Sequence, residues 1–260
     1  IFNLNNQSLL SFSILHKKEH IVKKILEFDT FDPVKSDILD AFMTAVNPCS
    51  NPNRYESNGR CFQPKSFSDI NDDEDIFPKA FINIMNLLLE YDKNHSNLIR
   101  CDKLLPNGKS FFTSIPSYIY NISELVKFYL DHDVDPNMPD KFGIYPLEYA
   151  INKNNIDFVK ELLNSNKIDL SIRLNRNSTF PLQNETFLHL ASRNDTLKEF
   201  LARDLIDVNC TDALGETPLM KACRFRKYFN ITELFQKDNL DYHRCNNNGD
   251  DALAITKKGY

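Results

Sequence analysis

The sequence predicts an all-α fold in which short helical pairs repeat along the chain and stack into a solenoid. The first observation behind this prediction is a recurring turn. Glycine or asparagine, the residues that adopt positive φ most easily, lies two residues before each short helical pattern. This slot is occupied by Gly108, Gly143, Gly215, Gly249, Asn6 and Asn184. The recurrence indicates that one backbone turn is used repeatedly.

The spacing of these turns sets the length of the repeat. From Gly108 onward, the residues that open the helices after these slots are Ser110, Tyr145, Thr186, Thr217 and Asp251. They lie 35, 41, 31 and 34 residues apart. A period of roughly 33 residues, with some scatter, is typical of helical-pair repeats.

A longer amphipathic helix is expected after each short one. Its apolar residues have i, i+3, i+4 spacing, which places them on one helix face. The last apolar residues of these helices are Leu26, Leu89, Leu130, Leu163, Leu201 and Phe235. The first interval is 63 residues and the others are 33 to 41 residues. The second repeat therefore contains a large insertion.

Local capping and packing residues support the short helices. Thr217 is a favourable N-cap, and Pro218 suits the first helical position because its missing N–H has no intrahelical partner there. A small residue recurs five positions after the cap, at Ala150, Ala191 and Ala222. We expect these alanines to let two helices approach closely.

Three segments resemble the ankyrin-repeat family. Residues 212–222 are similar to the opening of an ankyrin repeat, and residues 125–137 resemble its second helix and exit. Residues 186–191 are similar to the family's Thr-Pro-Leu-His segment, with Phe in place of Pro. The resemblance implies a protein-binding solenoid with a concave face and turn tips. It also implies that Thr186 and His189 hydrogen-bond within the turn and to the neighbouring repeat.

We expect one ankyrin-repeat domain over residues 1–260, as a segment of a longer protein. Glu148 and Met220 replace the family's His, and the second repeat lacks the turn glycine and the Thr-Pro pair, so the boundaries are approximate. The expected repeats are 1–33, 34–104, 105–139, 140–174, 175–211, 212–246 and the partial repeat 247–260.

The insertion in the second repeat comprises residues 47–78. Two interpretations remain open, because loops of this length are either functional or disordered. It is either a solvated surface excursion or a functional element, namely a dedicated contact element or a docking site for a basic partner. Phe62 and Phe67 favour the functional interpretation. Its acidic cluster contains the candidate partner-binding residues Asp72, Asp73 and Asp75.

The other candidate partner-binding residues lie near turns. A smaller insertion, residues 175–183, carries Arg176 and Phe180 and is expected to project from the turn edge. Phe142 and Leu214 each precede a turn glycine, where an exposed apolar side chain suits a contact anchor. The alternative is that each side chain folds back on its neighbour.

Basic and aromatic residues interleave at positions 224–228. In one interpretation Arg224 and Arg226 meet an acidic partner. In the other, this segment is a solvated helix end.

No residue pattern indicates catalysis, a cofactor or a metal. Residues 108–110 read Gly-Lys-Ser but lack the upstream glycine of a phosphate-binding loop. His16 and His20 are four residues apart, but Lys17 stands where a metalloprotease motif has its Glu. We therefore expect a non-enzymatic protein–protein interaction module. The alternative is a regulatory or substrate-targeting segment of a larger enzyme or effector whose catalytic part lies outside this chain.

Charge and cysteine usage narrow the expected partners and compartment. The net charge of −5 favours neither nucleic acid nor an anionic membrane as a partner. No apolar run approaches the roughly 18 residues needed to span a bilayer. No pair among the six cysteines has the spacing of a zinc or redox motif, so we expect reduced thiols in a cytoplasmic protein. We also expect the protein to be monomeric. A signal outside this segment would be needed for delivery elsewhere.

Overall fold

The computed structural model describes residues 9–27, 38, 41–42, 45, 77–95, 99–115, 122–176, 182–203 and 206–258. Contacts between residues divide the chain into two compact bodies. The N-terminal body comprises Ile1–Val134 and the C-terminal body comprises Asp135–Tyr260. The division falls near the end of the expected repeat 105–139. A single continuous domain stays a prediction.

The N-terminal body is built from helices. They are α1 (Leu9–Leu15), α2 (Glu19–Leu26), α4 (Phe77–His95), the 3₁₀ helix η3 (Phe112–Ser114) and α5 (Ile122–Asp131). Helix α1 packs on α2, α2 on α4 and α4 on α5. Phe111 and Phe112 contact Tyr129 edge to face, with ring centroids 5.6 and 5.4 Å apart. These buried aromatic rings join the turn before α5 to the helix itself.

Two boundaries in this body differ from expectation. Helix α4 begins at Phe77, so the insertion expected over residues 47–78 ends two residues earlier. Pro78 fits the first turn of this helix because the N–H it lacks has no intrahelical partner there. The short helix expected after Ser110 is a single 3₁₀ turn. Residue 116 is proline, which disfavours the α conformation at Ile115, and Ile115 is extended at ψ 123°.

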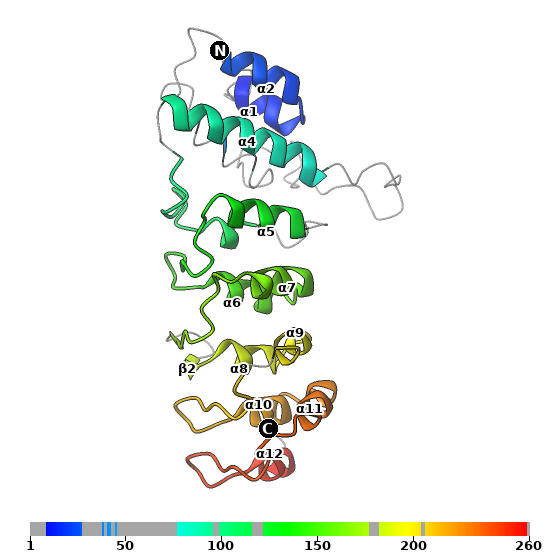
Figure 1. Cartoon of the computed structure of the whole chain (residues 1–260). Helices are drawn as coiled ribbons and strands as arrows, with labels where there is room; N and C mark the ends of the chain where they lie inside the picture. The colour runs from blue at the N-terminus through cyan, green and yellow to red at the C-terminus, as the bar shows by residue number, and fades with distance from the viewer. Residues whose placement is uncertain are drawn as a thin grey trace, which may run out of the picture. The chain divides into compact units, whose positions relative to one another are not determined.

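The C-terminal body consists of successive helical pairs (Figure 1). The first helices of its repeats are α6 (Pro146–Asn152), α8 (Phe187–Ala191), α10 (Pro218–Arg224) and α12 (Ala252–Lys258). The second helices are α7 (Ile156–Asn164), α9 (Leu197–Leu201) and α11 (Tyr228–Phe235). Each first helix packs on the next first helix, and α9 packs on both α7 and α11. The alanines expected at close helix contacts, Ala150, Ala191 and Ala222, are fully buried.

The smaller expected insertion contains a short antiparallel ribbon. Strand β1 (Leu174–Arg176) pairs with strand β2 (Leu182–Glu185). Asn175 lies opposite Gln183 in this register. The ribbon therefore extends the turn that leads into α8.

The recurring turn has the backbone conformation that the sequence predicted. The φ angle at the slot is positive at every described position, namely Gly108 (79°), Gly143 (75°), Gly215 (73°), Gly249 (78°) and Asn184 (58°). Asn6 lies outside the described residues. The same left-handed conformation occurs between the paired helices, where Lys17, Asn154 and Arg226 occupy it.

Candidate partner-binding surface

The turn tips of the C-terminal body are held by side chain to backbone hydrogen bonds. The Asp140 carboxylate accepts the N–H groups of Phe142 and Ile144, at 2.8 and 2.9 Å. Asp212 makes the same pair of bonds with Leu214 and Glu216, both at 2.9 Å. Short acidic or amide side chains favour such turns because they bond to the backbone that follows them. The chain thus fixes the backbone on both sides of each tip.

Phe142 and Leu214 are exposed on these tips. Their side chains are 65% and 47% accessible to solvent, so neither folds back into a neighbouring repeat. The Nζ atom of Lys141 lies 5.1 Å from the centroid of the Phe142 ring. Asn247 in the next tip donates its N–H to the carbonyl oxygen of Leu214 at 3.0 Å. It also donates its side-chain amide to Ala213 at 2.9 Å. Adjacent tips are therefore joined, and Leu214 is presented on a braced loop.

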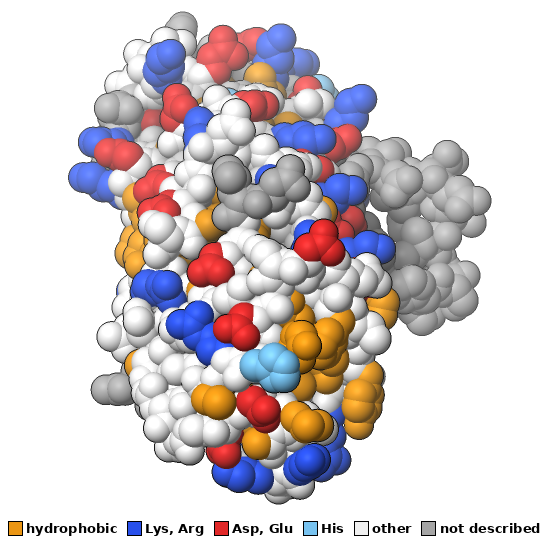
Figure 2. Space-filling model, turned by 60° about the horizontal axis from the view of Figure 1, so that its bottom comes forward, with side chains coloured by type: hydrophobic (Ala, Val, Ile, Leu, Met, Phe, Trp, Pro, Cys, Tyr) orange, Lys and Arg blue, Asp and Glu red, His pale blue; other side chains and the backbone are white. Residues whose placement is uncertain are grey.

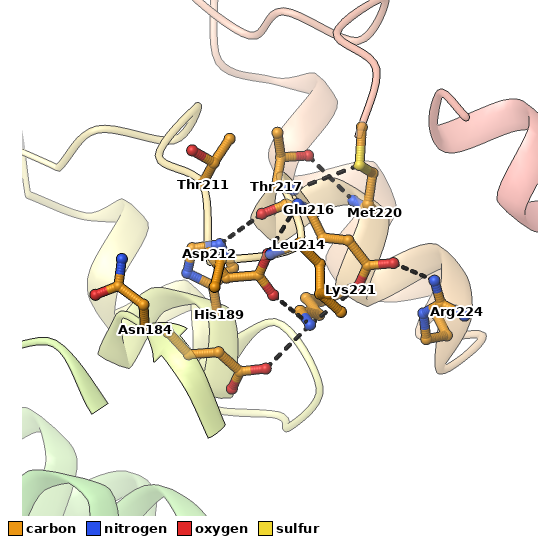
Figure 3. A network of polar contacts seen from close by, with 12 residues as sticks. Asn184, His189, Thr211, Asp212, Leu214, Glu216, Thr217, Met220, Lys221 and Arg224 are labelled. Carbon is orange, nitrogen blue, oxygen red and sulfur yellow. Dashed lines mark hydrogen bonds and ion pairs between the residues drawn. The ribbon is translucent and has the colours of Figure 1, made fainter. Parts of the chain in front are cut away.

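Behind the tips lies a buried network of charges centred on Lys221 (Figure 3). Its Nζ atom lies 2.7 Å from Asp212, 2.9 Å from Glu216 and 3.0 Å from Glu185. All four side chains are at most 8% exposed. Glu185 belongs to the turn before α8, whereas Asp212 and Glu216 belong to the turn before α10. Lys221 therefore ties two successive turns together.

An ion pair recurs at equivalent positions of three successive repeats. In each, the carboxylate precedes the N-cap of the first helix and the cation lies eight residues later. The pairs are Glu185–Arg193 at 2.7 Å, Glu216–Arg224, and Asp250–Lys258 at 2.5 Å. Together with Lys221, the first two pairs bring three cations to three carboxylates, so the charges in the network balance.

The charges of the network reinforce one another. Burial favours a lower pKa for Lys221, but the surrounding carboxylates outweigh burial and its pKa is raised. Burial favours a higher pKa for Glu216, but hydrogen bonds from Arg224 and Lys221 outweigh burial and its pKa is lowered. Both groups stay ionised near neutral pH. The network therefore acts as a structural clamp behind the tips.

Thr186 and His189 make the contacts that the family resemblance implied. The Nδ1 atom of His189 accepts the Thr186 N–H at 3.1 Å and lies 2.8 Å from the Thr186 hydroxyl. Its Nε2 atom lies 2.9 Å from the carbonyl oxygen of Glu216 in the next repeat and donates to it. The prediction of a structural role within the turn and between repeats is confirmed.

The structure also places a cysteine beside this histidine, a pairing that the sequence did not reveal. The Sγ atom of Cys210 lies 3.9 Å from Nδ1 of His189. Burial lowers the pKa of His189 and raises the pKa of the Cys210 thiol. A nucleophilic cysteine needs the opposite, a thiolate stabilised by a nearby cation or base. Both shifts favour a neutral imidazole and a protonated thiol.

The remaining predicted contact residues have varied environments. Arg224 is paired with Glu216, whereas Arg226 is exposed in the turn between α10 and α11. Arg176 ends strand β1. The other candidates, Phe180, Asp72, Asp73 and Asp75, lie outside the described residues.

The described residues contain neither a candidate metal site nor a candidate membrane-spanning helix. No group of three or more His, Cys, Asp or Glu side chains in them is arranged to hold a metal ion. None of the described helices combines the length and apolar character required to cross a membrane.

Comparisons with known proteins agree with this architecture. A family model described as ankyrin repeats (3 copies) matches residues 117–202. No curated protein matches the chain. A similar solved structure is a chain in the complex of the Bd0816 predatory endopeptidase from Bdellovibrio bacteriovorus with immunity protein Bd3460. Its TM-score is 0.53 at 20% identity, over 67% of this chain and 86% of that chain. At this identity the likeness concerns the fold alone, and with the family match it confirms the predicted fold class.

Proposed function

The chain is an ankyrin-repeat protein, and we propose that its C-terminal body binds another protein through the turn tips and the adjoining face of the first helices. Repeat solenoids of this kind offer extended surfaces for protein partners. The observation that carries the proposal is the exposure of Phe142 and Leu214 on tips whose backbone is already fixed.

Fixed tips reduce the entropic cost of association. A mobile loop loses conformational freedom when it binds, and that loss subtracts from the affinity. The backbone hydrogen bonds accepted by Asp140 and Asp212, and the one donated by Asn247, fix the tip backbone before any partner arrives. Exposed apolar side chains on a fixed backbone have the character of binding hot spots.

Binding without catalysis is the role that we propose for these residues. The pair with the strongest resemblance to a reactive centre, Cys210 and His189, has pKa shifts that disfavour a thiolate. We also propose a cytoplasmic setting, because no pair among the six cysteines has the spacing of a zinc or redox motif.

The test compares affinity capture from the native cell by the intact protein and by a variant with Phe142→Ser and Leu214→Ser. We expect the tip variant to lose specific, cross-linkable partners while keeping its circular dichroism spectrum and melting temperature. The matched control is Ile156→Ser, which removes an apolar side chain that is 43% exposed at the start of α7, away from the tips. Retention of all partners by the tip variant, or their loss in the control alone, would refute the proposal.

A further inference from the structure

We propose that the turn between α10 and α11, together with the start of α11, forms a second interaction surface that binds an acidic protein segment carrying apolar side chains. We call this surface the aromatic–basic patch. It consists of Phe225, Arg226, Lys227, Tyr228 and Phe229.

Three aromatic rings of the patch face solvent. Tyr228 is 72% exposed, Phe229 is 60% exposed and Phe225 is 44% exposed. Figure 2 brings the C-terminal end of the chain forward and shows that hydrophobic side chains are exposed there, gathered beside a histidine. Aromatic side chains provide a large contact area at a low entropic cost, which makes them effective anchors at interfaces.

The repeat itself turns these positions outward. Tyr228 and Phe229 begin α11 as Ile156 and Asp157 begin α7, and those two residues are also exposed although α9 packs on α7. Phe235, the eighth residue of α11, differs: its counterpart in α7 is Leu163, which is 2% exposed. We therefore leave Phe235 out of the patch. Coverage by a following helical pair would not bury the patch.

The patch is also held in place from beneath. The guanidinium carbon of Arg193 lies 5.3 Å from the centroid of the Phe225 ring. Arg193 is itself fixed by its 2.7 Å ion pair with Glu185. The turn backbone is closed by a 2.9 Å bond from the Lys227 N–H to the carbonyl oxygen of Ala222. A partner would therefore meet a largely preorganised surface.

Arg226 occupies a backbone position that suits another residue type. Its φ angle is 54°, in the left-handed region that favours glycine and asparagine. The equivalent position between α6 and α7 is Asn154, with a φ angle of 51°. An arginine held at this strained position is a reason to infer a function for its side chain.

The charge of the patch selects an acidic partner. Arg193, which lies against Phe225, and Arg224, which precedes the patch in the chain, are already paired with Glu185 and Glu216. Lys227 has one exposed partner, Asp195, at 3.5 Å, and such surface pairs are weak. Within the described residues Arg226 makes no ion pair. Two incompletely neutralised cations beside three aromatic rings fit carboxylates that alternate with apolar side chains.

An acidic protein segment fits better than a nucleic acid. Nucleic-acid binding depends on cations that neutralise several phosphates along the strand. The patch offers only two such cations, and the chain carries a net charge of −5. A short acidic segment needs only one or two charge contacts, because the aromatic rings supply the rest of the surface.

The test begins with a phage-displayed random peptide library, selected on the whole chain and counter-selected on the Tyr228→Ser, Phe229→Ser variant. We expect the enriched peptides to combine Asp or Glu with Phe, Leu or Tyr. Fluorescence anisotropy should then show about a tenfold or greater loss of affinity for the best peptide in that variant. The tip variant Phe142→Ser, Leu214→Ser should bind the same peptide normally, which separates this surface from the tips.

Arg226→Asn distinguishes binding from a structural role. Because this substitution introduces the residue found at the equivalent position, Asn154, it should keep or raise the melting temperature. It should still lower the affinity for the peptide several-fold. Unchanged affinity in both patch variants, enrichment of basic peptides, or no enrichment would overturn the proposal. Tighter, patch-dependent binding of single-stranded RNA or of phosphatidylserine vesicles would also overturn it.

Discussion

The repeat formed by α6 and α7 and the repeat formed by α10 and α11 share a backbone scaffold but differ in the charges placed on it. Asp140 and Asp212 cap their turns in the same way. The residue before the N-cap is Ile144 in one repeat and Glu216 in the other. Four residues after the cap, Lys221 stands in the later repeat where its counterpart carries no charge. Hydrogen bonds to the backbone define the repeat, whereas ion pairs make individual repeats different.

The largest expected effect breaks the Lys221 network. Lys221→Leu leaves Glu185, Asp212 and Glu216 without their shared cation, and removing one partner of a buried ion pair typically costs about 3–5 kcal/mol. We expect a loss of this size in the free energy of unfolding, measured by urea denaturation. The matched variant Tyr149→Leu changes the equivalent position of the earlier repeat and should cost less, because it strands no buried charge. Equal losses in the two variants would contradict the proposed clamp.

The next comparison concerns two turn glycines. Gly215→Ala and Gly249→Ala both place a side chain at positive φ, which costs about 1–2 kcal/mol. A Cβ at residue 215 would also lie 2.6 Å from Oδ1 of Asn247, whereas nothing lies within 4 Å of one at residue 249. We expect Gly215→Ala to cost more by about 1 kcal/mol in urea denaturation. Asn247→Ala should reduce this difference, and an undiminished difference would show that the clash is elsewhere.

A smaller loss of stability is expected when an asparagine that bridges two repeats is removed, and the loss should be the same at two equivalent positions. Asn209 donates to the carbonyl oxygen of Asn239 at 2.7 Å and accepts the N–H of Asp241 at 2.8 Å. Asn137 makes the equivalent two bonds, to Lys167 and Asp169. We expect Asn209→Ala and Asn137→Ala each to cost about 1–2 kcal/mol in thermal or urea unfolding.

The control for these bridging asparagines is Asn248→Ala at an exposed tip, which should change stability little. If Asn209→Ala or Asn137→Ala loses no more stability than this control, the hydrogen bonds of that asparagine to the next repeat contribute nothing measurable.

The smallest expected effect is a dependence on pH. Burial lowers the pKa of His189, so below its ordinary value of 6.5 the unfolded chain binds more protons than the folded chain. Stability contributed by neutral His189 is therefore present above that pH and is lost as the pH falls. The surrounding carboxylates of Asp212 and Glu185 oppose the shift only in part. His189→Gln should flatten the pH dependence of the melting temperature between neutral pH and about pH 5. An unchanged slope would mean that other groups cause it.

Sequence patterns predicted those features that depend on local chemistry. The turn slots were correct at every described position, since positive φ restricts the residue types that can occupy them. The Thr186–His189 contact, which the family resemblance implied, is also confirmed, and it is possible because residues three apart meet across a helix start. Sequence reasoning missed Lys221, although two clues were available: its position is apolar in neighbouring repeats, at Leu190 and Ile255, and carboxylates precede the caps at Glu185 and Glu216.

The sequence by itself determined the period, the turns and the helical pairs, because these follow from backbone preferences and from apolar residues spaced within a few positions of one another. Only the tertiary structure decided which side chains pair across repeats and which stay exposed. Lys221 reaches Glu185 across 36 residues of chain, and Phe225 lies against Arg193 across 32. Such contacts depend on how one repeat is placed on the next, and neither partner's local sequence specifies that placement.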